Sequence, residues 1–402
     1  MKACSAASRT MVLVGAVQLV CLTGSVRAQE PVATGARDVA RARALRAPAQ
    51  LGDGWETRSL EADSLAVEPM VALLDAIRSD TFPAMHSVLV AHRGRLVFEA
   101  YFPGYAWSYA AEGFRGARTA FGPDTRENVQ SVSKSVTGLL VGIARDRGYL
   151  PDLNASVFSF FPEYSRYAEG AKSGITLQSL LLMASGLTWN EQEVFYTQPN
   201  NDIVQLHVVD DPVGYILGKD LAHPPMTAWY YNGGGPVLLG EIVRRTSGQR
   251  LDEFAQKYLF GPLGITGVEW TVMRSGVVDA PGGLELRPRD MAKLGQLVLN
   301  GGTWRGRRIV SEDWVKAMTS RQVRFNATDG YGYYWWTKTY LSGSDSIPSV
   351  RADGWGGQRI MVFPTLDLVV VLTGGNYTLA RQPRLDEIVT RFIIPAARGE
   401  RT

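Results

Sequence analysis

The chain has 402 residues, of which 45% are hydrophobic and 20% are charged, an ordinary composition for a folded protein that buries its own core. The net charge of +3 at pH 7 is too small to indicate a nucleic-acid partner, and no basic run stands out. The two cysteines, Cys4 and Cys21, lie in an N-terminal segment that we expect to be removed. Their removal would exclude disulfides, thiolate metal sites and a cysteine nucleophile.

Residues 1–28 have the features of a secretory signal peptide. Lys2 and Arg9 give a positive start, and the apolar stretch 11–22 is shorter than the roughly 20 residues that a membrane helix requires. We therefore predict cleavage after Ala28, a periplasmic or secreted location, and no stable membrane insertion after cleavage. Retention of the segment as an anchor is the alternative.

After this segment, the chain is predicted to place strands near both ends and helices between them. Residues 29–55 are rich in Ala, Arg, Pro and Gly, and are predicted to form a linker or loose arm. Later elements are inferred from apolar periodicity and turn residues. Helices are expected at 69–79, 136–144, 177–183, 236–244, 291–299 and 385–397, and strands at 86–92, 96–102, 358–363 and 368–373.

This order of elements favours a two-lobed α+β fold within residues 56–398. The terminal strands are expected to pair into one antiparallel sheet, from about 60–125 and 340–398, flanked by the N- and C-terminal helices. Residues 131–335 are expected to form a separate helical lobe. A cleft between two such lobes is the usual place for a ligand.

The sequence Ser131-Val132-Ser133-Lys134 is the first motif that indicates chemistry. If a helix starts at Ser131, the i to i+3 spacing places the Lys134 amine beside the Ser131 hydroxyl, and the helix-start N–H groups favour developing negative charge. A lysine whose pKa is lowered by desolvation can activate a serine nucleophile. The alternative is a serine that caps a helix, with a solvated lysine after it.

The sequence Tyr230-Tyr231-Asn232 is the second motif. A Tyr230 hydroxyl near the serine–lysine pair can relay protons, and the Asn232 amide can hold a substrate carbonyl. The alternative is an aromatic core strand that ends in an Asn-Gly turn.

Other templates do not fit the sequence. It contains no Gly-x-Ser-x-Gly nucleophile motif. The aromatic residues of 331–336 are expected either to wall the cleft or to pack the lobes together. The histidines lack the spacing of metal ligands, so no metal is predicted. They are expected to be surface or core residues, and a catalytic triad that uses one of them is the alternative. They are His86, His92, His207 and His223.

Five ordered motifs together resemble the serine β-lactamases, DD-peptidases and related esterases, in particular their class C-like branch. Residues 131–135, followed by an apolar helix, are similar to the nucleophile motif of this family, and residues 148–153 resemble the stretch after it. Residues 175–187 are similar to the segment "ITLxxLLxMxSGL". Residues 230–232 stand where the family has Tyr-x-Asn, and residues 261–265 match its "PLGM" element.

The resemblance implies a two-lobed serine hydrolase that cleaves an ester or amide through an acyl-enzyme, with no metal or cofactor. It assigns Ser131 as the nucleophile, Lys134 and Tyr230 as the proton relay, and Asn232 as a substrate-binding residue. The backbone N–H groups of Ser131 and Trp355 are expected to hold the oxyanion.

The third motif departs from the family, because Ala352-Asp353-Gly354 replaces Lys-Thr-Gly or His-x-Gly. Gly354 is expected to line the cleft, and by strand alternation Ala352 would do so too, while Arg351 and Asp353 would point elsewhere. The missing cation disfavours acidic substrates, unless Arg359 restores the charge. In this respect the chain resembles family members that are esterases or amide hydrolases, including those acting on aminohexanoate amides.

Two other functions stay open at this level. One is a β-lactamase or DD-peptidase that acts on β-lactams or peptidoglycan peptides. The other is a penicillin-binding or sensor protein without turnover. The expected partner in each case is a small molecule, and the sequence does not indicate the oligomeric state.

Overall fold

The computed structural model describes residues 32–378 and 384–400. The predicted signal peptide and both cysteines therefore lie outside the described residues, and export of the chain stays a prediction. Within the described ranges, no helix combines the length and the apolar character needed to cross a membrane.

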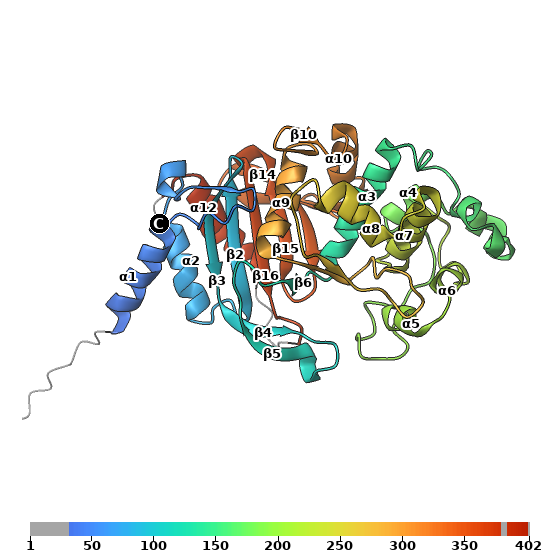
Figure 1. The fold of residues 1–402 in the computed structure, drawn as a ribbon, viewed down its shortest axis with the longest axis horizontal. Coiled ribbons are helices and arrows are strands. Elements are labelled where there is room, and N and C mark those ends of the chain that lie inside the picture. Colours follow the sequence, from blue (N-terminus) through green and yellow to red (C-terminus); the bar gives the residue numbers. More distant parts are fainter. Residues whose placement is uncertain (1–31, 379–383, 401–402) are drawn as a thin grey trace, which may run out of the picture.

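A sheet of nine strands, counted over the described residues, is the centre of one lobe (Figure 1). Its strand order is β1-β3-β2-β16-β15-β14-β13-β12-β11, and every neighbouring pair is antiparallel except β1 with β3. Strands from both ends of the chain thus meet at its middle, where β2 pairs with β16. The strands are β1 (Glu56–Thr57), β2 (Met85–His92), β3 (Arg95–Tyr101), β11 (Val323–Arg324), β12 (Asp329–Tyr331), β13 (Trp336–Ser342), β14 (Asp345–Gly354), β15 (Gln358–Phe363) and β16 (Leu368–Gly374).

Helices cover both faces of this sheet. On one face, α2 (Glu68–Arg78) packs with α11 (Leu385–Ile388) and α12 (Ile394–Ala397) around a shared apolar core. On the other face lie α9 (Pro288–Leu299) and α3 (Val132–Asp146), and α3 also contacts α7 of the helical lobe. The predicted α+β fold, with an antiparallel sheet between terminal helices and a helical lobe, is confirmed.

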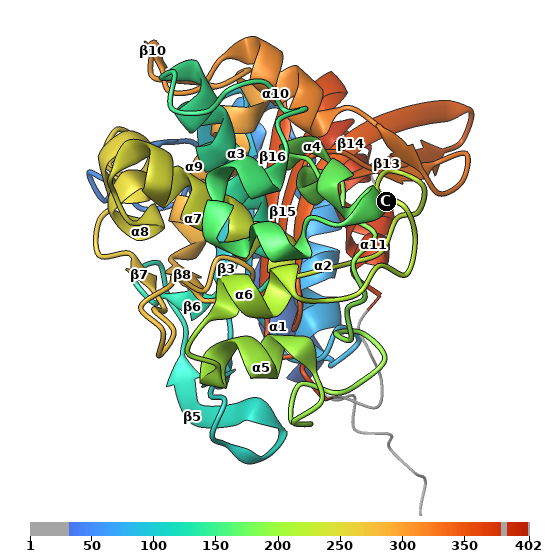
Figure 2. The ribbon, with the colours of Figure 1, turned by 90° about the vertical axis from the view of Figure 1, so that its right-hand side faces the viewer.

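The helical lobe faces the viewer in Figure 2. Its helices are α4 (Leu177–Leu181), α5 (Asp202–Val208), α6 (Pro212–Leu217), α7 (Gly234–Ser247), α8 (Leu251–Ala255) and α10 (Glu312–Thr319). Three small sheets of two or three strands each, counted over the described residues, lie outside the main sheet. They are the hairpin β4 (Pro103–Trp107) and β5 (Arg115–Ala120), the set β6 (Glu127–Asn128), β8 (Leu284–Leu286) and β7 (Glu269–Trp270), and the pair β9 (Thr303–Trp304) and β10 (Arg307–Arg308).

The sheet extends further along the chain than predicted. The expected strands match β2, β3, β15 and β16, but β11 to β14 place its final part from residue 323 instead of about 340. The helix α9 also packs on β15 and β16, so it belongs to the sheet and not to the helical lobe. Strand β14 contains Pro348 and mixes buried with exposed positions, which weakens the alternation that marks a strand.

The predicted linker or loose arm is corrected by the structure. Helix α1 (Val32–Leu45) packs along α2, with Ala40 and Ala44 buried one turn apart. Trp55 is buried as well, and its Nε1 donates to the Arg289 carbonyl over 3.2 Å. Two alanines form a packing face so small that the segment shows little apolar periodicity in the sequence.

A glycine in α3 allows the close approach of α10. An ideal Cβ at Gly142 would lie 2.1 Å from Cδ1 of Trp314. We predict that Gly142→Ala lowers the free energy of unfolding by about 1–3 kcal/mol, because the ring is packed in the core. Urea denaturation measures the change, with Gly35→Ala in α1 as the control, since no atom lies within 4 Å of its added Cβ. A Gly142→Ala protein as stable as the control would contradict this packing.

Candidate active site

The turn before α3 fixes the position of Ser131. Strand β6 pairs with β8, and the chain then passes through Gln130, whose φ of 51° lies in the left-handed region. The Gln130 N–H donates to the Asn128 side chain over 2.8 Å, and the Ser133 hydroxyl donates to the Gln130 carbonyl over 2.6 Å. These bonds hold a conformation that non-glycine residues rarely adopt, and they place Ser131 at the start of the helix.

Lys134 lies one helical turn after Ser131 and contacts it directly. Its Nζ donates to Ser131 Oγ over 2.9 Å and to the Pro281 carbonyl over 3.0 Å. The residue is only 3% exposed. The spacing predicted from the sequence therefore brings the hydroxyl and the amine together in a buried position.

A carboxylate that the sequence reasoning missed accompanies the lysine. Glu191 is 1% exposed, and its Oε1 lies 3.7 Å from Lys134 Nζ. Its other oxygen accepts from Trp189 Nε1 and from the Gly233 N–H, each over 2.8 Å. Glu191 follows the "SGL" motif by four residues in a segment without periodicity, so its position near that motif was the only available signal.

The surroundings of Lys134 raise its pKa. Burial disfavours the ammonium form, but the negative potentials of Tyr231 and Glu191 outweigh this effect. The expectation of a lowered lysine pKa is therefore corrected, and the physical reason is the combined effect of Tyr231 and the buried Glu191 carboxylate, which favour the ammonium form. Burial also raises the pKa of Tyr231, while Lys134 and Ser131 act in the opposite direction as its hydrogen-bond partners.

The structure brings Tyr231, and not Tyr230, to the serine–lysine pair. Tyr231 is 8% exposed, and Lys134 Nζ lies 4.8 Å from the centre of its ring. Tyr230 is 38% exposed, and its hydroxyl donates to Glu193. The tyrosine assignment is thus corrected, because the two neighbouring side chains leave this non-helical segment in different directions.

Asn232 lies beside this group but has a structural contact. Its side-chain oxygen accepts from the Gly234 N–H over 2.8 Å at the start of α7, and the residue is buried. It does not line either of the two hollows next to Ser131 that the described residues form. The predicted role in holding a substrate carbonyl is not supported by this position.

Ser131 lies between two hollows. The first, here named the α5 cavity, has a volume of about 390 Å³ and is lined by one face of α5, the loop 279–283 and the aromatic residues Trp107 and Tyr109. The second, the β14 hollow, has a volume of about 630 Å³ and is lined by the end of β14 and the loop 191–196. Both include Ser131, Glu191, Tyr196 and Trp355.

The end of β14 passes very close to the turn that carries Ser131. An ideal Cβ at Gly354 would lie 2.3 Å from the Val129 carbonyl and 3.2 Å from Gln130 Cβ, so only glycine fits there. Trp355 follows it and lines both hollows, with its ring stacked on Tyr196 at 5.0 Å. The predicted placement of Gly354 and Trp355 at the cleft agrees with this geometry.

The face of β14 that meets the cleft differs from the prediction. Ala352 is fully buried in the core, whereas Asp353 lines the β14 hollow. Alternation along the strand is kept, since Gly354 and Ala352 share a face, but the buried turn before α3 covers that face. The carboxylate of Asp353 pairs with Arg351 at 2.9 Å and Arg359 at 3.3 Å.

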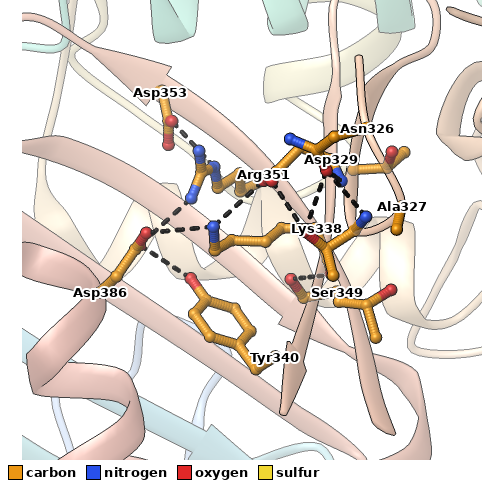
Figure 3. A network of polar contacts seen from close by, with 12 residues as sticks. Asn326, Ala327, Asp329, Lys338, Tyr340, Ser349, Arg351, Asp353 and Asp386 are labelled. Carbon is orange, nitrogen blue, oxygen red and sulfur yellow. Dashed lines mark hydrogen bonds and ion pairs between the residues drawn. The ribbon is translucent and has the colours of Figure 1, made fainter. Parts of the chain in front are cut away.

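Arg359 does not supply the missing cation. It lies 2.7 Å from Asp386, which also binds Arg351, Lys338 and Tyr340 in the network of Figure 3. Each of these basic groups is therefore held by carboxylates of the sheet and of α11. No arginine, and no lysine other than Lys134, lines either hollow among the described residues.

The remaining predicted residues divide between core and cavity. His86 and His92 are buried and pair with Glu127 and Asp63, and His223 is exposed, but His207 lines the α5 cavity. No cluster of side chains suited to a metal occurs in residues 32–378 and 384–400. Of the aromatic run 331–336, Trp336 walls the β14 hollow, and the others are core.

Comparison with known proteins identifies the family. The family model described as Beta-lactamase matches residues 80–387. The chain belongs to the beta-lactamase family. This confirms the predicted resemblance and places the enzyme among the serine hydrolases.

Two curated relatives and one solved structure illustrate the range of this family. The chain is 29% identical over 279 residues to the 6-aminohexanoate-dimer hydrolase of Paenarthrobacter ureafaciens, covering 63% of this chain and 67% of that protein. It is 33% identical over 140 residues to the lovastatin esterase of Penicillium rubens, covering 32% of each. The octameric penicillin-binding protein homologue from Pyrococcus abyssi shares the fold, with a TM-score of 0.60 at 19% identity, covering 83% of this chain and 77% of that chain.

The contact between Glu191 and Lys134 predicts the effect of removing the carboxylate. Glu191→Gln should lower the pKa of Lys134, because a negative charge that favours the ammonium is lost while the side-chain shape is kept. The chain has eight lysines, so NMR titration of ¹³Cε-labelled lysine resolves this signal, which Lys134→Arg assigns. Glu193→Gln is the matched control. An unchanged or higher Lys134 pKa in Glu191→Gln would refute the pairing.

Proposed function

We propose that this enzyme hydrolyses an ester or amide through an acyl-enzyme formed on Ser131. The observation that carries the proposal is the 2.9 Å contact between Lys134 Nζ and Ser131 Oγ at the junction of two hollows. A hydroxyl held by a buried amine at the start of a helix fits the requirements of nucleophilic catalysis. The names of the two curated relatives, an amide hydrolase and an esterase, support the class of reaction.

In the acylation step, Ser131 Oγ attacks the substrate carbonyl carbon and its proton passes to the Lys134–Tyr231 pair. Lys134 and Tyr231 lie close enough for their titrations to be coupled. The form that can accept the serine proton is therefore the one in which the pair has lost one of the two protons that it carries when both groups are protonated. The N–H groups of Ser131 and Trp355 would hold the oxyanion. The bond to the leaving group then breaks, and the same proton passes to the departing alcohol or amine.

In the deacylation step, water replaces the leaving group. The Lys134–Tyr231 pair takes a proton from this water, whose oxygen attacks the acyl carbon, and the proton returns to Ser131 Oγ as the acid leaves. Glu191 keeps Lys134 in place through both steps, because its own position is fixed by two hydrogen bonds. It acts as a positioning residue.

The charges around the hollows favour neutral substrates over carboxylates. Lys134 is compensated by Glu191, and Arg351 and Arg359 are compensated by Asp353 and Asp386. A charge-assisted hydrogen bond contributes about 1.5–3 kcal/mol, so a substrate that depends on one would lose about ten- to a hundredfold in kcat/KM.

We therefore predict that p-nitrophenyl butyrate is hydrolysed with a kcat/KM at least about tenfold higher than that of nitrocefin. The two chromogenic assays measure this directly, and Ser131→Ala is the control that should abolish turnover and covalent labelling by a fluorophosphonate. Intact-protein mass spectrometry reports the label.

The other outcomes separate the rival functions. Efficient nitrocefin turnover with negligible ester turnover would make the protein a β-lactamase. A stoichiometric burst without turnover would indicate a penicillin-binding or sensor protein. Full labelling of Ser131→Ala would remove Ser131 as the nucleophile.

The two adjacent tyrosines provide a matched test of the proton relay. Tyr231→Phe should lower kcat/KM about 10²- to 10⁴-fold, the usual range for loss of a proton-transferring group. Tyr230→Phe should stay within about threefold of the wild type, as is common for exposed substitutions. Ester hydrolysis and thermal unfolding of both variants are measured together. The reverse order of the two effects would restore Tyr230 as the relay.

A further inference from the structure

The α5 cavity contains one ionisable pair that the proposed reaction does not use. Ile203, Val204 and Val208 give one face of α5 an apolar lining, and His207 lies on the same face. Its Nε2 is 3.4 Å from Oδ2 of Asp279, which belongs to the loop 279–283. A polar pair within an apolar lining is the arrangement by which pockets orient a ligand.

Asp279 is held rigidly in this position. Its N–H donates to the Thr271 carbonyl over 2.8 Å, and its own carbonyl accepts from Trp270 Nε1 over 2.8 Å. Two residues later, the Pro281 carbonyl accepts from Lys134. The same short loop thus carries the carboxylate and one wall of the nucleophile site.

The charge balance of the cavity indicates the ligand. Lys134 and Glu191 pair with each other, and among the described residues the cavity lining contains one further acidic side chain, Asp279, and one further basic side chain, His207. Protonated His207 neutralises Asp279 at most, and neutral His207 leaves the carboxylate without a direct ion-pair partner. This end of the cavity is therefore negative or neutral, and never positive. The titratable side chains that line the cavity with His207 are Asp279, Lys134, Glu191, Tyr109 and Tyr196.

We propose that Asp279 and His207 form a charge-specificity site that binds the ammonium group of an amine-bearing ester or amide whose carbonyl lies at Ser131. The apolar face of α5 would contact the methylene chain between the two groups. Protonation of His207 would weaken this selection, because the imidazolium compensates Asp279. The inference rests on the proposed hydrolase function and adds to it the charge of the substrate.

The test uses substrates that differ only in their end group. One series is the p-nitrophenyl esters with an acyl chain –(CH₂)₆–X, where X is ammonium, methyl or carboxylate. The second series places the amine on the alcohol, as 6-aminohexyl acetate against heptyl acetate. We expect the ammonium substrate to exceed the methyl substrate in kcat/KM by about tenfold in at least one series at pH 8, and the carboxylate to be poorest.

Variants assign the effect to the pair. Asp279→Asn should bring the ammonium-to-methyl ratio close to one, whereas Asp210→Asn, which removes an 83% exposed carboxylate, should leave it unchanged. The ratio should fall below neutral pH in the wild type and stay constant in His207→Gln. Using a ratio cancels any effect of Asp279 on the chemical step at Ser131.

Failure of this inference differs from failure of the hydrolase function. A ratio near one in both series, or a ratio that survives Asp279→Asn, would overturn the specificity site while p-nitrophenyl acetate is still hydrolysed. Absence of p-nitrophenyl acetate turnover in the wild type would instead overturn the proposed function.

Discussion

One buried ammonium determines how the rest of the site is built. Lys134 is almost inaccessible to water, and an unpaired charge in such a place would cost several kcal/mol. Its compensation comes from Ser131, from the Pro281 carbonyl and from Glu191, which belong to three separate parts of the chain. Glu191 in turn depends on Trp189 and on the backbone at the start of α7. The electrostatic requirement of one side chain therefore brings the segments together.

This requirement also links the two lobes. Helix α3, which begins after Ser131, lies between the sheet and the helical lobe, and the strand β14 approaches the turn before it backbone to backbone at Gly354. The hairpin of β4 and β5 closes the site from the sheet side, where the Tyr109 hydroxyl donates to the Tyr196 carbonyl over 3.2 Å. The helix α3, the end of β14 and the β4–β5 hairpin, which surround the site, thus come from different parts of the fold.

The parts of this structure that the sequence predicted are those governed by local geometry. Strands β2, β3, β15 and β16 appeared as apolar runs, and the contact of Ser131 with Lys134 follows from helical spacing. The parts that were missed depend on distant contacts. The choice between Tyr230 and Tyr231 is made by the direction in which the chain enters α7, and the partner of Glu191 lies far away in sequence. Similarly, the covered face of β14 is set by the turn before α3, which no pattern within the strand reveals.

The position of Ala352 affects how the specificity of this enzyme can evolve. The residue is fully buried in the main core, on the same face of β14 as Gly354, which contacts the turn before α3. A lysine placed there would add a long chain and a charge to close-packed interior, at a large cost in stability. A lysine at this position would therefore require neighbouring residues to change as well, so one substitution at position 352 does not by itself give the cleft a cation for acidic substrates.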